Sequence, residues 1–207
     1  MDIKRVVEPS LQENTYVLIS EDDCVIIDPG SDDDTILAQI HKLIAGKRLR
    51  GVLYTHCHFD HIRGGRYFNA DQYMSEEDID DLPLQSSRAK MMWGVDFKEP
   101  ENIKPLTKQI ILGGFNFTVF QTPGHTNGSV CFVLNKSQKL NLSNPVMFSG
   151  DTLFKGTYGR IDLGGNGAQM TASLKFLSTL PPETVFYPGH GESSTIGAEL
   201  RWLKTIP

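Results

Sequence analysis

The sequence predicts an α/β protein in which two mixed β-sheets pack face to face, with helices on their outer faces. Short β-branched and aromatic runs alternate with helical patterns near both ends of the chain, and they cluster in the middle. A chain of 207 residues, of which 39% are hydrophobic, is long enough to bury one large core. This order of elements favours layers of sheets covered by helices. We therefore expect a single domain over residues 1–207.

The first third of the chain has the pattern of strands, a helix and a further strand. Residues 14–20 and 24–28 are short strand-like runs separated by a polar turn, which predicts a hairpin. Apolar residues then recur at helical spacing over 33–45, after aspartates that can cap a helix. The apolar run 51–55 predicts a strand that leads into the segment HCHFDH. This segment thus follows the end of a strand, where open α/β sheets place their ligands.

The rest of the chain continues the mixed pattern. We predict a short strand at 70–74, followed by a polar segment to residue 105 with helical pieces at 75–81 and 85–93. Strongly β-like runs then extend from residue 109 to Asp151. The remaining elements are a glycine-rich loop, a helix, a strand and a final helix, at 156–167, 168–179, 183–187 and 195–204.

Charge and composition argue against several classes of partner. The formal net charge is −5 and the sequence has no run of lysine and arginine, so we expect no nucleic-acid partner. We expect no membrane association either, because no apolar stretch is long enough for a span and the N-terminus lacks a secretory signal. The three cysteines indicate free thiols in a reducing compartment. We therefore expect a cytoplasmic protein, or an organellar matrix protein if a transit peptide has been removed; the sequence leaves its oligomeric state open.

The histidines are concentrated after predicted strands. Five of the six lie in turn-like stretches that follow apolar β runs, namely His56, His58, His61, His125 and His190. Asp151, in the segment FSGDT, has a similar position. The sixth histidine, His41, lies on the predicted helix 33–45, and we expect it to be an ordinary surface residue.

This pattern has the chemistry of a site for two divalent metal ions. His56 and His58, two residues apart, can point to one ion, whereas Asp60 and His61 lie on the next turn and are free to bind a second. The two predicted ligand sets, which share Asp151, are His56, His58 and His125, and Asp60, His61 and His190. Imidazole and carboxylate ligands favour zinc here, with iron or manganese as alternatives. Two such ions can hold a hydroxide between them at neutral pH.

Four motifs resemble those of the metallo-β-lactamase superfamily. They are HxHxDH at 56–61, TPGHT at 122–126, SGDTLF at 149–154 and PGHG at 188–191. The resemblance implies an αβ/βα four-layer sandwich with metals in a cleft at one edge, between the two sheets. The segments NTYVL and VIIDPG are also similar to the first hairpin of the family, which implies that Asp28 is a structural residue near the site.

Within the superfamily, the segment FSGDTLFKGTYGRIDLGG resembles short, single-domain glyoxalase II-like (hydroxyacylglutathione hydrolase-like) enzymes. The resemblance implies hydrolysis of an S-acylglutathione-like thioester. Asp60, which would also orient the nucleophile, and Asp151 are the predicted catalytic residues. The predicted contacts with a small anionic substrate are Lys155, Tyr158 and Arg160. We expect no separate C-terminal helical domain of the kind that contributes glutathione contacts in the longer enzymes.

Two departures from the glyoxalase II pattern keep another activity open. Asp162 stands where a tyrosine is expected, and Cys57 replaces the middle histidine of the first motif. THCH and TPGHT also resemble persulfide dioxygenases, in which the equivalents of His56, His125 and Asp151 hold one iron and O₂ oxidises glutathione persulfide to sulfite. We favour the hydrolase because the glycine-rich loop lacks the cysteine of those dioxygenases.

Further alternatives are a lactonase-type hydrolase, a β-lactamase and a metal-binding module without catalysis, since the site rather than the fold selects the reaction. We predict that Cys57 is a small packing residue that points away from both ions. For Met91, Met92 and Trp93 the favoured prediction is packing on the sheet, and the alternative is an apolar wall over the cleft.

Overall fold

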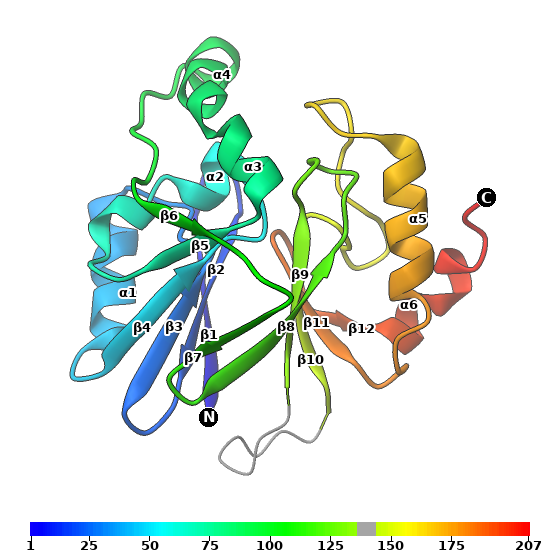
Figure 1. The fold of residues 1–207 in the computed structure, drawn as a ribbon, viewed down its shortest axis with the longest axis horizontal. Coiled ribbons are helices and arrows are strands. Elements are labelled where there is room, and N and C mark those ends of the chain that lie inside the picture. Colours follow the sequence, from blue (N-terminus) through cyan, green and yellow to red (C-terminus); the bar gives the residue numbers. More distant parts are fainter. Residues whose placement is uncertain (136–143) are drawn as a thin grey trace.

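The computed structural model describes residues 1–135 and 144–207, which fold into four layers. Two six-stranded sheets lie face to face in the middle (Figure 1). Helix α1 (Asp34–Ile44) covers the outer face of the first sheet, and α5 (Gly167–Leu177) and α6 (Ile196–Leu203) cover that of the second. The predicted fold class, two mixed sheets with helices outside, is confirmed.

The first sheet is built from the N-terminal half of the chain, in the order β1-β2-β3-β4-β5-β6. Its strands are β1 (Asp2–Val7), β2 (Asn14–Ile19), β3 (Asp23–Ile27), β4 (Arg48–Leu53), β5 (Gln72–Met74) and β6 (Ile103–Pro105). Strands β1 to β3 are antiparallel, whereas β3 to β6 run parallel. The predicted hairpin is therefore β2–β3. The sequence pattern did not reveal β6, a three-residue strand that ends in a proline.

The second sheet has the order β12-β11-β10-β9-β8-β7. Its strands are β7 (Gln109–Leu112), β8 (Phe115–Gln121), β9 (Val130–Leu134), β10 (Val146–Gly150), β11 (Val185–Pro188) and β12 (Ser194–Thr195). Among the described strands of this sheet, β10 and β11 pair in parallel and the other neighbours are antiparallel. The short strand β12 occupies the start of the predicted helix 195–204, which begins instead at Ile196 because Thr195 caps it.

Successive side chains of a strand face two different cores. On β2, Leu18 packs between the sheets and Val17 packs towards α1. On β10, Phe148 packs between the sheets and Met147 packs towards α5 and α6. Because side chains alternate along a strand and both faces are covered, β3 and β10 are buried along their whole length.

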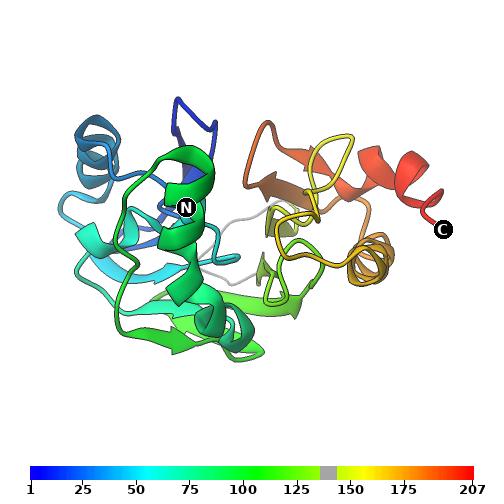
Figure 2. The ribbon, with the colours of Figure 1, turned by 90° about the horizontal axis from the view of Figure 1, so that it is seen from above.

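Shorter helices gather at one edge of the sandwich. They are α2 (Phe59–Ile62), α3 (Glu76–Asp81) and α4 (Gln85–Trp93), with 3₁₀ turns at Gly65–Tyr67 and Leu82–Leu84. The helical pieces predicted at 75–81 and 85–93 are confirmed as α3 and α4. Figures 1 and 2 show α4 on the side of the first sheet and the glycine-rich segment 156–167 on the side of the second.

Three smaller observations bear on the predictions. None of the helices found in residues 1–135 and 144–207 is long and apolar enough to cross a membrane. Cys24, Cys57 and Cys131 are all buried and free. His41 is exposed on α1, as predicted.

Candidate metal centre

The central ligand loop follows β4 and leads into α2. Asp28, at the end of β3, anchors this loop: its Oδ1 accepts from the backbone N–H of Thr55 at 2.7 Å, and its Oδ2 accepts from Thr55 Oγ1 at 2.6 Å. Asp28 has a left-handed backbone (φ 49°), which aspartate tolerates better than most residues. The resemblance implied a structural role for Asp28, and these contacts have that character.

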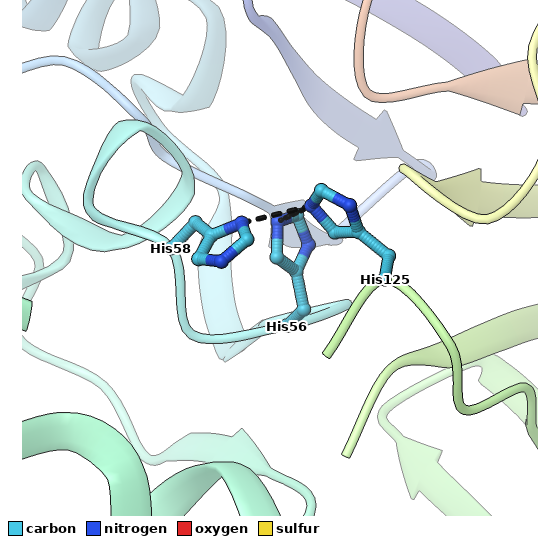
Figure 3. Close-up of side chains that lie close together, drawn as sticks. All are labelled: His56, His58 and His125. Atoms are coloured by element: carbon cyan, nitrogen blue, oxygen red, sulfur yellow. Dashed lines mark hydrogen bonds between the residues drawn. The ribbon is translucent and has the colours of Figure 1, made fainter. Parts of the chain in front are cut away.

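The first predicted ligand set converges on one point (Figure 3). Nε2 of His125 lies 2.8 Å from Nδ1 of His58 and 3.2 Å from Nε2 of His56. Ligands around a tetrahedral zinc at about 2.0–2.1 Å lie roughly 3.3 Å from one another, so these nitrogens are spaced like ligands of one ion. All three rings are almost fully buried.

The second predicted set lies beside the first, and Asp151 lies between them. Asp151 Oδ1 is 3.4 Å from His61 Nε2, and Oδ2 is 3.6 Å from His190 Nε2. The same Oδ2 is 3.5 Å from His125 Nε2 in the first set. Asp60 Oδ2 completes the second group at 3.4 Å from His190 Nε2. The carboxylate of Asp151 therefore lies close to both groups, and its role as a bridging ligand stays a prediction.

Two atoms of this cluster have the properties of metal ligands. Among the described residues, His61 Nε2 and Asp151 Oδ1 are buried yet have no hydrogen-bond partner. Buried polar atoms without partners are rare and destabilising, and imidazole nitrogen with carboxylate oxygen is a donor set that suits zinc or iron. The motif PGHG leaves the space for them, since a Cβ at Gly189 would lie 2.2 Å from Asp151 Oδ1. The residues present thus fit two divalent ions.

Contacts behind the ligands fix their orientation. His125 Nδ1 lies 2.6 Å from the Arg160 carbonyl oxygen, and His190 Nδ1 lies 3.1 Å from that of Leu11. His61 Nδ1 lies 3.1 Å from Asp28 Oδ2. A carbonyl or carboxylate at Nδ1 holds the proton there and leaves the Nε2 lone pair for an ion. His56, His61 and Asp28 could also hold an ion, but both Asp28 oxygens already accept hydrogen bonds.

The two sets differ in their affinity for protons. Burial and the neighbouring imidazole of His125 lower the pKa of His58 to about 3. Burial also opposes a charge on His61, but Asp151, Asp28 and Asp60 outweigh it and raise the pKa of His61 well above its usual value. Burial acts against ionisation of Asp60 too, yet the hydrogen bond from His190 and the charge on His61 hold its pKa well below the usual range. The carboxylates of the second set therefore favour a positive charge beside them, whereas the surroundings of His58 disfavour one.

Asp78 on α3 joins the two loops that carry the first set, and sequence reasoning missed it. Its Oδ2 accepts from the backbone N–H of Cys57 at 2.8 Å and from Thr126 Oγ1 at 2.9 Å. Its Oδ1 accepts from the backbone N–H of Gly128 at 2.8 Å. A fully buried carboxylate that accepts hydrogen bonds from two loops holds these loops at a fixed separation. The acidic run SEEDIDD gave no signal that singled out one of its members.

Cys57 points away from the ligands, as predicted. Its side chain packs in the cluster between the first sheet and α1, where Gln85 Nε2 donates to Cys57 Sγ at 3.3 Å. Burial and the carboxylate of Asp78 raise the pKa of the Cys57 thiol well above its usual value. An inert thiol in this position has no role as a nucleophile.

A cavity of about 590 Å³ opens above the two sets. Its floor contains members of both sets, its α4 side contains Met91, Met92 and Trp93, and its opposite side contains Arg160 and Asp162. The favoured prediction for the three α4 residues, packing on the sheet, is wrong: these side chains are exposed and line the cavity. The sequence of α4 could not distinguish packing on the sheet from lining the cavity, because its apolar residues are consecutive rather than spaced along one face.

The predicted substrate contacts are separated in the structure. Arg160 lines the cavity, where its guanidinium donates two hydrogen bonds of 2.6 Å to Asp162. Lys155 pairs instead with Glu192 at 2.7 Å, and the ring of Tyr158 stacks on Trp202. Neither Lys155 nor Tyr158 is among the described residues that line this cavity.

Comparison with known proteins extends these observations. The family model of the metallo-beta-lactamase superfamily matches residues 9–190. A probable metallo-hydrolase of Streptococcus pyogenes is 34% identical, over 95% of this chain and 86% of the relative. A hydroxyacylglutathione hydrolase of Salmonella arizonae is 30% identical, over 88% of this chain and 63% of the relative.

Solved structures match almost the whole chain. TTHA1623, crystallised in a di-iron-bound form, is 34% identical with a TM-score of 0.80, covering 96% of this chain and 97% of the other. The BLEG-1 B3 metallo-beta-lactamase is 30% identical with a TM-score of 0.82, covering 97% of each. ETHE1 from Myxococcus xanthus is 26% identical with a TM-score of 0.74, covering 100% of this chain and 84% of the other. The family match, these relatives and the histidine and aspartate groups at the sheet edge show that the chain belongs to the metallo-β-lactamase superfamily.

Proposed function

We propose that the protein is a hydrolase that uses two divalent metal ions, preferably zinc, to cleave a small anionic thioester of the S-acylglutathione type. The observation that carries this proposal is the position of Asp151 between two three-residue ligand sets at the floor of a cavity. Similarity to a hydroxyacylglutathione hydrolase at 30% identity supports the thioester, and the di-iron form of TTHA1623 supports two metals.

The ions, Asp60 and the leaving sulfur have separate roles in the proposed hydrolysis. Two bound ions would polarise the thioester carbonyl and lower the pKa of a water molecule. Asp60 lines the cavity and its low pKa keeps it ionised, so it can accept a hydrogen bond from the attacking water and orient it. The sulfur leaves as a thiolate, which is stable near neutral pH, so the step needs no separate general acid.

A mononuclear iron persulfide dioxygenase is the second candidate. Cys57 between two ligands and the similarity to ETHE1 from Myxococcus xanthus are compatible with it. That reaction would need only His56, His125 and Asp151. With one iron on those three residues, no ion would lie at Nε2 of His61, which is buried and has no hydrogen-bond partner among the described residues. We therefore favour the binuclear hydrolase.

Metal content and two assays distinguish the candidates. The purified protein would be analysed for metals, then assayed for S-lactoylglutathione hydrolysis and for O₂ uptake with glutathione persulfide. We expect two metals per chain and thioester cleavage. One iron per chain with O₂ consumption would overturn the hydrolase, and cleavage of a β-lactam without thioester cleavage would move the proposal to another branch of the superfamily.

A pair of histidine variants tests the binuclear scheme. His58→Ala should nearly abolish thioester hydrolysis because it removes one of three ligands of the first set. His41→Ala is the matched control, since His41 is exposed on α1 and is not among the described residues that line the cavity. Full retention of hydrolysis in His58→Ala would contradict a role for the first set.

A further inference from the structure

Three consecutive apolar side chains at the end of α4 leave apolar surface exposed in the cavity. Met91, Met92 and Trp93 are 79%, 46% and 41% exposed, and all three line the cavity above the metal centre. Exposed apolar surface that is contiguous, rather than scattered, marks a binding site. Its position inside the cavity indicates that the ligand is a small molecule.

The apolar surface is continuous with the metal centre. The ring of Trp93 lies 5.0 Å from that of Phe59, measured between centroids. Phe59 directly follows His58, a residue of the first ligand set, and also lines the cavity. The two aromatic rings therefore connect the cavity floor with Met91 and Met92 at the rim. A ligand with its reacting carbon at the floor would extend along this surface.

Charged side chains also line the cavity, and one of them, Arg88, lies on α4 itself. Arg160 is paired with Asp162 through two hydrogen bonds of 2.6 Å, so this pair presents little net charge. Arg88 lines the cavity with a looser partner, since its Nη1 lies 3.6 Å from Asp81 Oδ2. The end of α4 at Met91, Met92 and Trp93 thus suits a hydrocarbon group, whereas Arg88 and Arg160 are left for the polar part of a substrate.

On the basis of the proposed thioester hydrolysis, we infer that the substrates are thioesters with an apolar acyl chain, aliphatic and of medium length, which packs on Met91, Met92 and Trp93. Thiol carriers are polar and charged molecules, so the apolar part of a thioester is its acyl group. Water adds its oxygen to the carbonyl carbon and the carbon–sulfur bond breaks, with its electron pair left on sulfur. Of the two water protons, one ends on the thiol and the other on the carboxylic acid, which releases it at neutral pH.

A series of substrates with one carrier tests this inference. S-acetyl-, S-hexanoyl-, S-octanoyl- and S-lactoylglutathione would be compared by kcat/KM. Each methylene that contacts the α4 surface should raise kcat/KM about twofold to fourfold. Trp93→Ala and Met92→Ala should flatten this dependence, so that the longer acyl chains lose their advantage over S-acetylglutathione. Ile111→Ala, which removes an exposed apolar side chain on β7 outside the cavity lining, should keep the full dependence.

A binding measurement gives a readout that does not depend on turnover. Octanoate should quench the fluorescence of Trp93, and Trp93→Phe should lose this quenching while Trp202 still reports a folded chain. If Trp93→Ala does not fold, Trp93→Leu replaces it in the kinetic comparison. Leucine keeps the surface apolar, so this variant should retain part of the chain-length dependence.

The outcomes separate the two proposals. Thioester cleavage with equal kcat/KM for all acyl chains, unchanged in Trp93→Ala, would overturn the apolar acyl site and leave the hydrolase standing. Quenching by octanoate without cleavage of any thioester would overturn the thioester hydrolase but keep an apolar ligand site. If octanoate did not quench the fluorescence and kcat/KM did not depend on chain length, the inference would be overturned.

Discussion

His61 is a buried histidine whose two ring nitrogens both lie near carboxylates. Its Nδ1 lies 3.1 Å from Asp28, and its Nε2 lies 3.4 Å from Asp151. Without an ion, these carboxylates favour the protonated ring, and the pKa of His61 is raised well above its usual value despite burial. For His58, in the other set, burial and the imidazole of His125 outweigh the charges of Asp60 and Asp151, and its pKa is lowered to about 3. Neighbouring histidines in one loop therefore differ sharply in proton affinity.

This difference predicts that the second ion is lost first as the pH falls. An ion must displace the proton of His61, whereas His58 carries no proton to displace above about pH 5. The second set should weaken by about tenfold per pH unit for each proton displaced, and the first set should change less. Equilibrium dialysis against limiting zinc between about pH 5.5 and 7.5 measures the stoichiometry. Loss of both ions together, or of the first ion before the second, would contradict this order.

At the scale of elements, α3 links two ligand loops that are distant in the sequence. Asp78 receives hydrogen bonds from Cys57 in the loop after β4 and from Thr126 and Gly128 in the loop before β9. Cys57 lies between two ligands of the first set, and Thr126 follows the third. The distance between the two loops, and so the convergence of three imidazoles, depends on this carboxylate.

Asp78→Asn should therefore weaken the first metal site more than the second. The amide keeps the size of the side chain but presents two N–H donors to groups that are themselves donors, which costs about 1–3 kcal/mol of stability. Loss of such a supporting contact should lower the affinity of the first site by about 10–100-fold. Cobalt titration, followed by visible absorption, reports the coordination of the first ion directly.

Asp80→Asn is the control for this experiment, because Asp80 is exposed on the same helix. It should titrate like the unsubstituted protein. If Asp78→Asn gave an unchanged cobalt spectrum and affinity while only its melting temperature fell, Asp78 would contribute to folding and not to ligand positioning.

At the scale of the whole molecule, the metal centre depends on the packing of one sheet against the other. The first sheet leads into His56, His58, Asp60 and His61, and loops of the second sheet supply the other three predicted ligands. Phe148 on β10 contacts Tyr16 on β2 across the interface, with ring centroids 5.3 Å apart. The inter-sheet core therefore sets the separation of the two halves of the site.

Phe148→Ala should lower the free energy of unfolding by about 3–5 kcal/mol, because it leaves a cavity in a fully buried interface. Urea denaturation followed by circular dichroism measures this loss. Ile111→Ala, at an exposed position on β7, should change the free energy of unfolding by less than about 0.5 kcal/mol. Similar losses in both variants would mean that Phe148 packs no better than a surface residue.

The sequence by itself determined the fold class, most elements and the seven candidate ligands. Alternating and helical patterns identified strands and helices because each element must bury one face, and strand ends marked by glycine and proline identified the ligand loops. Short spacing limits where side chains point, and on that ground His56 and His58 were assigned to one predicted ligand set and Asp60 and His61 to the other. The short elements β6 and β12 were missed, since two or three residues carry no period.

Only the tertiary structure decided which other residues serve the site. It brought Asp78 beneath two ligand loops, set Met91, Met92 and Trp93 along the cavity, and directed Lys155 towards Glu192. These placements depend on how α3, α4 and the glycine-rich loop pack at the sheet edge. Consecutive apolar residues or a run of acidic ones do not specify which side chain faces inwards, whereas contacts between segments distant in sequence do.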